Sequence, residues 1–279
     1  QHAGFRAFDQ FEAIKAIAES EETDFEVIVA DNSDEPAILD DYFRTELDDS
    51  RFRLLPPQAT VLSMVDNWER TMPEVRGRWV SMIGDDDHID ASVLQLIRRY
   101  EREQPELEVV AWSRISYNWP DNRAIATLAT IPLGHVTHIP DRKTVKDKLY
   151  RWSERESRPM GGFGIYHGAV RRSLMERIKR RYSDRYFEHP TVDFDNTCKV
   201  VSEAKAMVFC QRPFSVLGAC VASNSASTQS FETMQKLVDD FYRDLGNGQQ
   251  IQEDDFPFSP KLPGLAIFSS IAATTWWFC

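Results

Sequence analysis

The chain has 279 residues, of which 42% are hydrophobic and 28% are charged, so it can bury a large core and has the balance of a globular protein. Its 44 acidic residues outnumber its 33 basic residues, and the formal net charge of −11 excludes a general nucleic-acid binder, which needs a basic surface. The 4 cysteines show no CxxC spacing, which excludes a zinc finger and a disulfide framework and favours a cytoplasmic location.

The first hundred residues alternate between helical and strand-like patterns. "FEVIVA" at residues 25–30 is a nearly continuous apolar run, typical of a strand buried on both faces. Strand–helix alternation predicts a parallel sheet wound by helices. The expected helices cover residues 8–20, 36–47, 59–72 and 90–103, and the expected strands cover residues 25–30, 51–55 and 77–83.

After Pro105 the pattern changes, which favours a soft boundary inside one compact unit. Two strand-like runs at residues 107–119 and 122–133 suggest an antiparallel pair, and residues 158–168 read as a glycine-rich loop that leads into a short strand. Further helices are expected at residues 143–157, 169–182 and 191–204, and further strands at 206–210 and 213–221.

The chain ends in an apolar run at residues 264–279 that is rich in Ser and Thr. A helix needs roughly 20 apolar residues to span a bilayer, and this run is shorter than that. We therefore expect a terminal helix packed on the protein, with docking on a membrane surface as the alternative.

Three adjacent carboxylates, Asp85, Asp86 and Asp87, follow the strand expected at residues 77–83, and Asp31 follows the strand at residues 25–30. The ligand crevice of an open α/β sheet lies beyond the carboxyl ends of its strands. Adjacent carboxylates raise one another's pKa unless a cation lies among them, and Mg²⁺ or Mn²⁺ binds such groups together with phosphate oxygens. The alternative is a helix start decorated with acid, which the helix dipole favours.

The order and spacing of these segments resemble the family 2 glycosyltransferases with the GT-A fold, in a bacterial branch. "FEVIVADNSDE" is similar to the family's second strand, and "LSMVDNWERTMPEVRGRWVSMIGDDDHID" to the segment that leads into its DxD motif. "GIYHGAVRRSLM" and "PFSVLGACVASNSAS" resemble acceptor-side segments, so the resemblance covers about residues 5–227.

The resemblance implies a mixed, mostly parallel sheet flanked by helices, with a small antiparallel element on the acceptor side. It places a catalytic domain at residues 1–230, with a nucleotide-binding part at about 1–105 and an acceptor-side part at about 106–230. Residues 231–279 would form a helical extension. The family's chain normally opens with a strand, whereas this sequence starts at the following helix, so that strand is either absent or trimmed from the sequence given; if it is truly absent, the sheet loses a central strand.

The implied activity is metal-dependent transfer of a sugar, with inversion, from a nucleoside-diphosphate sugar to a hydroxyl group. A UDP-sugar is the favoured donor, and the acceptor is a saccharide, a lipid-linked saccharide or a protein. The protein would lie at the inner face of the membrane if its terminal helix docks there. Mn²⁺ or Mg²⁺ would bind Asp87, helped by Asp85. The donor would contact Asp31, Asn32, Ser33, Asn67, Asp85 and Asp86.

The same resemblance favours Asp193 over Asp195 as the general base, with a helix N-cap as the alternative role of Asp193. His167 and Asp195 are expected on the acceptor side, although a lone histidine is more often structural.

Three other functions are alternatives to a glycosyltransferase. "DFDNT" matches the motif of haloacid-dehalogenase-like phosphatases, but "RYFEHPTV" before it is not the buried strand that this motif needs. A sugar nucleotidyltransferase shares the fold, but its N-terminal glycine-rich loop is not seen. A non-catalytic GT-A-like domain that binds a saccharide or a partner is the main alternative, because a chain that truly lacks the first strand would be expected to lose activity.

Overall fold

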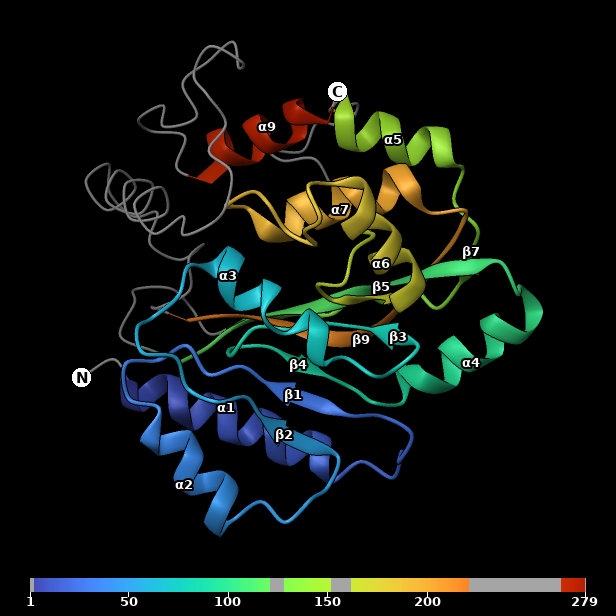
Figure 1. Cartoon of the computed structure of the whole chain (residues 1–279). Coiled ribbons are helices and arrows are strands. Elements are labelled where there is room, and N and C mark those ends of the chain that lie inside the picture. The colour runs from blue at the N-terminus through green and yellow to red at the C-terminus, as the bar shows by residue number, and fades with distance from the viewer. Residues whose placement is uncertain (1–2, 121–127, 152–161, 221–266, 279) are drawn as a thin grey trace.

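A computed structural model describes residues 3–120, 128–151, 162–220 and 267–278. A mixed sheet crosses the middle of the molecule, with helices above it and a smaller unit built on β1 (Val27–Val29) and β2 (Phe52–Leu54) below it (Figure 1). The helices above the sheet are α5 (Arg142–Tyr150), α6 (Arg172–Arg181), α7 (Val192–Glu203) and α9 (Ile267–Trp277).

The smaller unit consists of α1 (Ala3–Ala18), β1, α2 (Ala37–Thr45) and β2. β1 and β2 pair in parallel, with Val27 opposite Phe52, as the alternating pattern predicted. Their core is formed by Ile14, Ile17 and Leu39 together with Phe52. In the described part of the chain this pair is a sheet of its own and does not continue into the larger sheet.

Within the described residues the larger sheet has seven strands and is mixed, as expected for the GT-A fold. The long parallel strands β5 (Leu107–Asn118) and β9 (Ala206–Ala219) form its centre. β8 (Gly168–Arg171) lies antiparallel between β5 and β3 (Trp79–Val80), and β4 (His88–Ile89) lies antiparallel to β9. Two short strands complete it: β6 (Ala129–Thr130) pairs with β5, and β7 (Thr137–His138) pairs with β9.

Hydrophobic packing fixes helices on both faces of the sheet. α6 and α7 bury Leu174, Ile178 and Val200 completely in the main core. α4 (Val93–Glu103) covers the opposite face, where Val93 and Ile97 pack with residues of β5 and β9. No helix among the described residues is long and apolar enough to cross a membrane.

Tertiary contacts changed several predicted boundaries. The helix predicted from residue 169 begins instead as β8, because Ala169 and Val170 are buried in the sheet. The two strands predicted at 206–210 and 213–221 form one strand, β9, with a register shift next to Pro213, which lacks an N–H for the ladder. Of the strand predicted at residues 122–133, residues 129–130 form β6. Residues 121–127 lie outside the described residues.

Two other predictions concern the helices. The helix predicted at residues 59–72 is shortened to α3 (Met64–Glu69) and a 3₁₀ turn at Met72–Glu74, and Ser63 caps α3 by accepting from the Asp66 N–H. The packed terminal helix is confirmed as α9, which buries Ile271, Ala273 and Thr274.

Candidate functional site

α3 holds the carboxyl end of β1 in place. Asn67 Oδ1 accepts a 2.9 Å hydrogen bond from Arg70 Nε, and Arg70 Nη2 donates to the Asp31 carbonyl oxygen at 2.7 Å. Asn67 Nδ2 also reaches the Ala30 carbonyl at 3.5 Å. The structure therefore places Asn67 next to Asp31, both of which are predicted to contact the donor, and Arg70 links them.

The residues after β1 form a tight turn at the same place. Asp31 Oδ1 accepts from the Ser33 N–H at 2.8 Å, while Asp31 Oδ2 has no hydrogen-bond partner among the described residues. The Asn32 side chain donates to the Leu62 carbonyl at 3.0 Å and accepts from the Leu62 N–H at 2.8 Å. Because of these bonds the turn is pre-ordered, and Asp31 Oδ2 is a buried acceptor with no hydrogen-bond partner among the described residues.

Asp87 lies at the centre of a second group of contacts, after β3, and is only 2% exposed. Its Oδ2 accepts from the Gly84 N–H and from the Tyr166 hydroxyl, each at 2.8 Å, and its Oδ1 accepts from the Gly218 N–H at 2.8 Å. His167 Nε2 lies 3.1 Å from Oδ2. Burial alone would raise the pKa of Asp87, but His167 and these hydrogen bonds outweigh it, and the pKa lies below its ordinary value.

The contacts of Asp87 extend inward through His167. His167 Nδ1 is 2.9 Å from the Ser215 hydroxyl, which accepts from Trp112 Nε1 at 2.9 Å. Trp112 can only donate, so the proton of the Ser215 hydroxyl is available to Nδ1. His167 has a φ of 53°, a left-handed conformation that is uncommon for a side chain of this size. His167 was predicted on the acceptor side, but at 2% exposure it lies inside the protein.

The backbone of the aspartate loop is clamped against β9. The Asp86 carbonyl accepts from Trp119 Nε1 at 3.0 Å, and a Cβ on Gly218 would lie 1.7 Å from that carbonyl oxygen. Only glycine therefore permits this approach. With the backbone fixed and Asp87 turned inward, the side chain of Asp85 is exposed and that of Asp86 is half-buried.

This arrangement changes the expected metal ligands. Asp87 was predicted to bind the ion first, but its side chain is fully buried and already engaged. Asp85 and Asp86 are the members of the motif that solvent reaches. Among the described residues no group of three or more His, Cys, Asp or Glu is arranged to hold a metal. Two carboxylates fit a Mg²⁺ or Mn²⁺ ion that also binds waters and substrate phosphates.

Tyr166 joins the aspartate loop to the second predicted acidic site. Burial raises the pKa of its hydroxyl far above the usual value, and the negative charges of Asp87, Asp193 and Asp86 raise it further. The hydroxyl therefore stays protonated as a donor to Asp87. Its ring lies 5.8 Å from that of Trp68 on α3. The sequence prediction included His167 of the "YHG" segment and not Tyr166. The sequence has no local signal that the Tyr166 hydroxyl contacts the aspartate loop.

Asp193 lies in the first turn of α7 and is half-buried. The N-cap of α7 is Thr191, so the alternative in which Asp193 itself caps the helix is wrong. An acid in the first turn is stabilised by the helix dipole, which favours its ionised form. The negative charges of Asp193 and Asp86 both raise the pKa of the Tyr166 hydroxyl, so both acidic segments lie within electrostatic range of that group.

Asp195 has a different environment from Asp193. It is fully buried, and its Oδ2 accepts from Lys199 Nζ at 3.0 Å and from the Glu188 N–H at 2.9 Å. Lys199, also fully buried, lies 2.9 Å from Glu188 Oε2 and donates to the Tyr186 carbonyl at 3.1 Å. Asp195 was predicted on the acceptor side, and the structure instead makes it part of an internal ion cluster.

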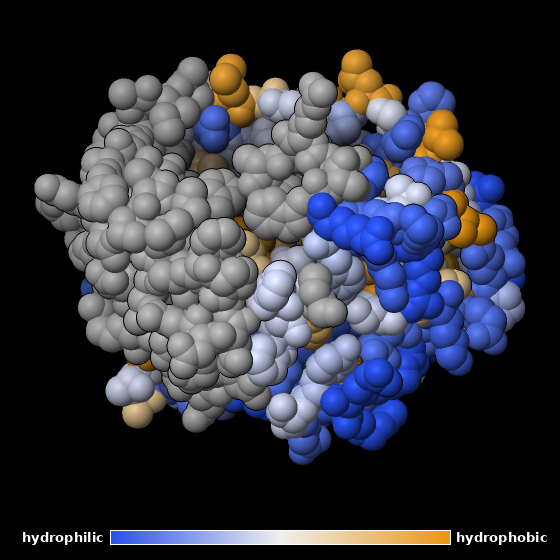
Figure 2. Space-filling view, turned by 90° about the horizontal axis from the view of Figure 1, so that it is seen from above, coloured by the Kyte–Doolittle hydropathy of each residue, from blue (hydrophilic) through white to orange (hydrophobic). Residues whose placement is uncertain are grey.

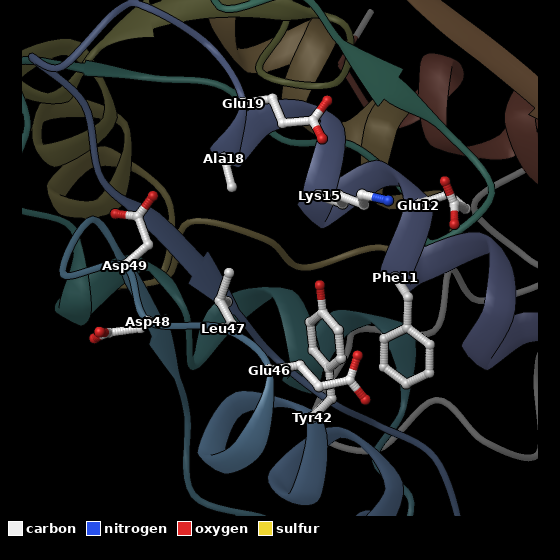
Figure 3. Close-up of a pocket in the computed structure, with 10 residues that line it drawn as sticks. All are labelled: Phe11, Glu12, Lys15, Ala18, Glu19, Tyr42, Glu46, Leu47, Asp48 and Asp49. Atoms are coloured by element: carbon white, nitrogen blue, oxygen red, sulfur yellow. The ribbon is translucent and has the colours of Figure 1, made fainter.

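A cavity of about 600 Å³ lies elsewhere, between α1 and α2 (Figure 3). The rings of Phe11 and Tyr42 face each other on one side, with centroids 4.4 Å apart. Five acidic side chains and one lysine line the rest, which would repel a diphosphate. None of the predicted site residues lines it: its lining is Phe11, Glu12, Lys15, Ala18, Glu19, Tyr42, Glu46, Leu47, Asp48 and Asp49.

Replacing Asp87 by Asn tests the structural role of this carboxylate. An amide cannot accept all the hydrogen bonds that Asp87 receives, so we expect the free energy of unfolding to fall by about 2–4 kcal/mol. The pKa of Asp87 is depressed in the folded state, so its stabilising charge is present above its ordinary pKa of 3.8 and is lost as the pH falls through the lower folded value. Urea unfolding from pH 7 to pH 2 should show this acid-dependent loss in the wild type and a smaller one in D87N. Equal stability of the two proteins at pH 7 would contradict the account.

The comparisons identify the fold. No protein-family model and no curated protein matches the chain. Residues 1–349 of S. aureus TarS, solved with UDP-GlcNAc, match with a TM-score of 0.54 at 13% identity, over 84% of this chain and 63% of that one. A mannosyltransferase from Pyrobaculum calidifontis, solved with GDP-Man and Mn²⁺, matches with a TM-score of 0.50 at 15% identity, over 96% of this chain and 66% of that one.

The chain thus spans slightly less than two thirds of each of these structures. At this level of identity the likeness establishes architecture, and the architecture is the mixed, helix-flanked sheet of the GT-A type that the sequence predicted.

Proposed function

We propose that the protein is a metal-dependent glycosyltransferase of family 2 that moves a sugar from a nucleoside-diphosphate donor to a hydroxyl acceptor. The observation that carries this proposal is the Tyr166 hydroxyl, which donates to Asp87 of the aspartate loop and whose pKa is also raised by the charges of Asp193 and Asp86. The aspartate loop has carboxylates that suit a metal-bound diphosphate, and Asp193 is a separate carboxylate that suits a general base. The nucleotide sugars in the two similar structures are in keeping with this division of roles.

The nucleoside would bind at the carboxyl end of β1. Asp31 Oδ2 can accept from a base or ribose group, and Asn32 and Ser33 shape the turn beside it. Asn67 fixes Arg70, whose guanidinium holds the Asp31 backbone. A UDP-sugar is the proposed donor, in a nucleotide-binding part formed by about residues 1–105.

The diphosphate would lie at the aspartate loop. Asp85 and Asp86 would hold the Mn²⁺ or Mg²⁺ ion, while Asp87 keeps the loop in shape through Tyr166 and Gly218. When bound, such an ion neutralises negative charge on the departing diphosphate. Neutralisation is needed because the local charge of three aspartates would otherwise repel the donor.

Asp193 would act as the general base. Its carboxylate takes the proton of the acceptor hydroxyl while the acceptor oxygen bonds to the anomeric carbon and the bond from that carbon to the diphosphate breaks. Attack from the side opposite the leaving group inverts the configuration. The acceptor would contact the part formed by about residues 106–230, and it would be a saccharide, a lipid-linked saccharide or a protein. Residues 231–279 would form an extension. The reaction would take place in the cytoplasm.

A donor panel tests this function. We expect the protein with Mn²⁺ and a UDP-sugar to release UDP faster than the same mixture with EDTA, and Asp86→Asn to lower that rate at least tenfold (about 1.4 kcal/mol of lost stabilisation). Asp48→Asn, which removes an exposed acid elsewhere, should leave the rate unchanged. Nucleotide binding without release from any donor, in the presence of saccharide acceptors, would favour the non-catalytic alternative.

A further inference from the structure

Exposed large hydrophobic side chains are concentrated in two segments. Of eight such residues in the described part of the chain, five lie in residues 128–139 and two in α9, and only Val61 lies elsewhere. Leu133 is 90% exposed and Ile139 is 65% exposed, so these side chains are not packed on the protein. The set is Leu128, Ile131, Leu133, Val136, Ile139, Trp276 and Trp277. Clustering of this kind marks an interaction surface.

The apolar segment at residues 131–139 leads directly into α5, and α5 is basic. Residues 141–151 carry five basic side chains and two acidic ones, in a protein whose net charge is −11. One acid, Asp147, is shared by Lys143 at 2.5 Å and Arg151 at 3.4 Å, so it does not neutralise both. Positive charge therefore gathers next to the exposed apolar residues.

α5 also adjoins α9, and the two helices lie side by side at the top of the molecule (Figure 1). Trp276 and Trp277, at 51% and 48% exposure, lie at the end of α9. Seen from above, hydrophobic residues border the hydrophilic surface on the right, the side on which α5 and β7 lie (Figure 2). We call the surface formed by residues 131–139, α5 and Trp276–Trp277 the α5–α9 face.

We propose that the α5–α9 face docks on a bilayer that contains anionic lipid. Its basic side chains match the negative headgroups, and its tryptophans and aliphatic residues match the boundary between headgroups and acyl chains. The contact is peripheral, because no described helix can span the membrane. Two copies of this basic face would repel each other, which favours an anionic bilayer over a symmetric dimer through the same face. The inference does not depend on the proposed transfer reaction.

Vesicle sedimentation tests the proposal. We expect the protein to sediment with phosphatidylcholine vesicles that contain 30% phosphatidylglycerol, to stay in solution with pure phosphatidylcholine, and to be released by 0.5 M NaCl, which screens the charges. Lys146→Glu should weaken partitioning at least fivefold, since each basic residue near the surface contributes about that factor. Leu133→Asp should weaken it at least tenfold, because an inserting leucine is lost.

Two matched controls distinguish this face from general effects. Arg180→Glu makes the same charge change as Lys146→Glu at an exposed residue of α6. Val61→Asp makes the same apolar-to-acid change as Leu133→Asp at a residue that is 59% exposed and lies outside the face. Both should sediment like the wild type. Failure of the wild type to bind anionic vesicles, or an equal loss in a control, would overturn the proposal. So would a dimer in light scattering that Leu133→Asp dissociates without lipid, since the face would then join two copies.

Discussion

Asp193→Asn is expected to reduce sugar transfer by about 10²–10⁴-fold, the range that a general base contributes. The amide is close in shape to the carboxylate but cannot take the acceptor proton. Asp193 is half-buried in the first turn of α7 and is not the helix N-cap, so the folded structure should tolerate the change. Steady-state transfer and calorimetric donor binding should show a lower kcat with a nearly unchanged donor Kd.

Asp195→Asn is the matched control, two residues along the same helix. Asp195 is buried against Lys199, so its loss should lower stability and leave the transfer rate per folded molecule nearly unchanged. If D193N retained full transfer, the general base would have to lie elsewhere. If D195N instead lost transfer at full stability, the assignment of the two residues would be reversed.

Lys199→Met is expected to produce the largest loss of stability, about 3–5 kcal/mol in the free energy of unfolding. The Lys199 ammonium is fully buried within 3.0 Å of Asp195 and 2.9 Å of Glu188, and methionine would leave two buried carboxylates without their counter-charge. Urea denaturation at pH 7 measures the loss through the midpoint at constant slope.

The control for Lys199→Met is Lys205→Met. The Lys205 side chain is 64% exposed and 4.0 Å from Glu106, so this pair should contribute less than about 1 kcal/mol. Similar small losses in both variants would show that the internal ion cluster does not stabilise the fold.

Much of the architecture could be predicted from the sequence because it rests on local patterns. The apolar run before Asp31 and the helical spacing in α4 and α7 gave the right element types. The short strand predicted at the end of residues 158–168 lies further along the chain, as β8, because "AVR" is compatible with a helix and only its burial between β3 and β5 decides for a strand. Likewise, β9 continues past Pro213 because β5 pairs with it on both sides of the register shift.

The roles of the three adjacent aspartates could not be predicted in the same way. Asp87 turns inward because Tyr166 and Gly218, which are 79 and 131 residues away, hydrogen-bond to it. Such distant partners leave no local signal in the motif. By contrast, the spacing of Asp195 and Lys199, four residues apart on one helix, does predict an ion pair and could have excluded Asp195 from the acceptor side.

The proposed function requires that the aspartate loop and the end of β1 bind a nucleoside diphosphate together with a divalent metal ion. Isothermal titration calorimetry with UDP, GDP, ADP, CDP and dTDP, each with Mn²⁺ and again with EDTA, tests it most directly. At least one nucleotide, with UDP favoured, should bind in the presence of Mn²⁺ and lose its affinity with EDTA. No binding of any of these nucleotides in the presence of Mn²⁺ would contradict the account.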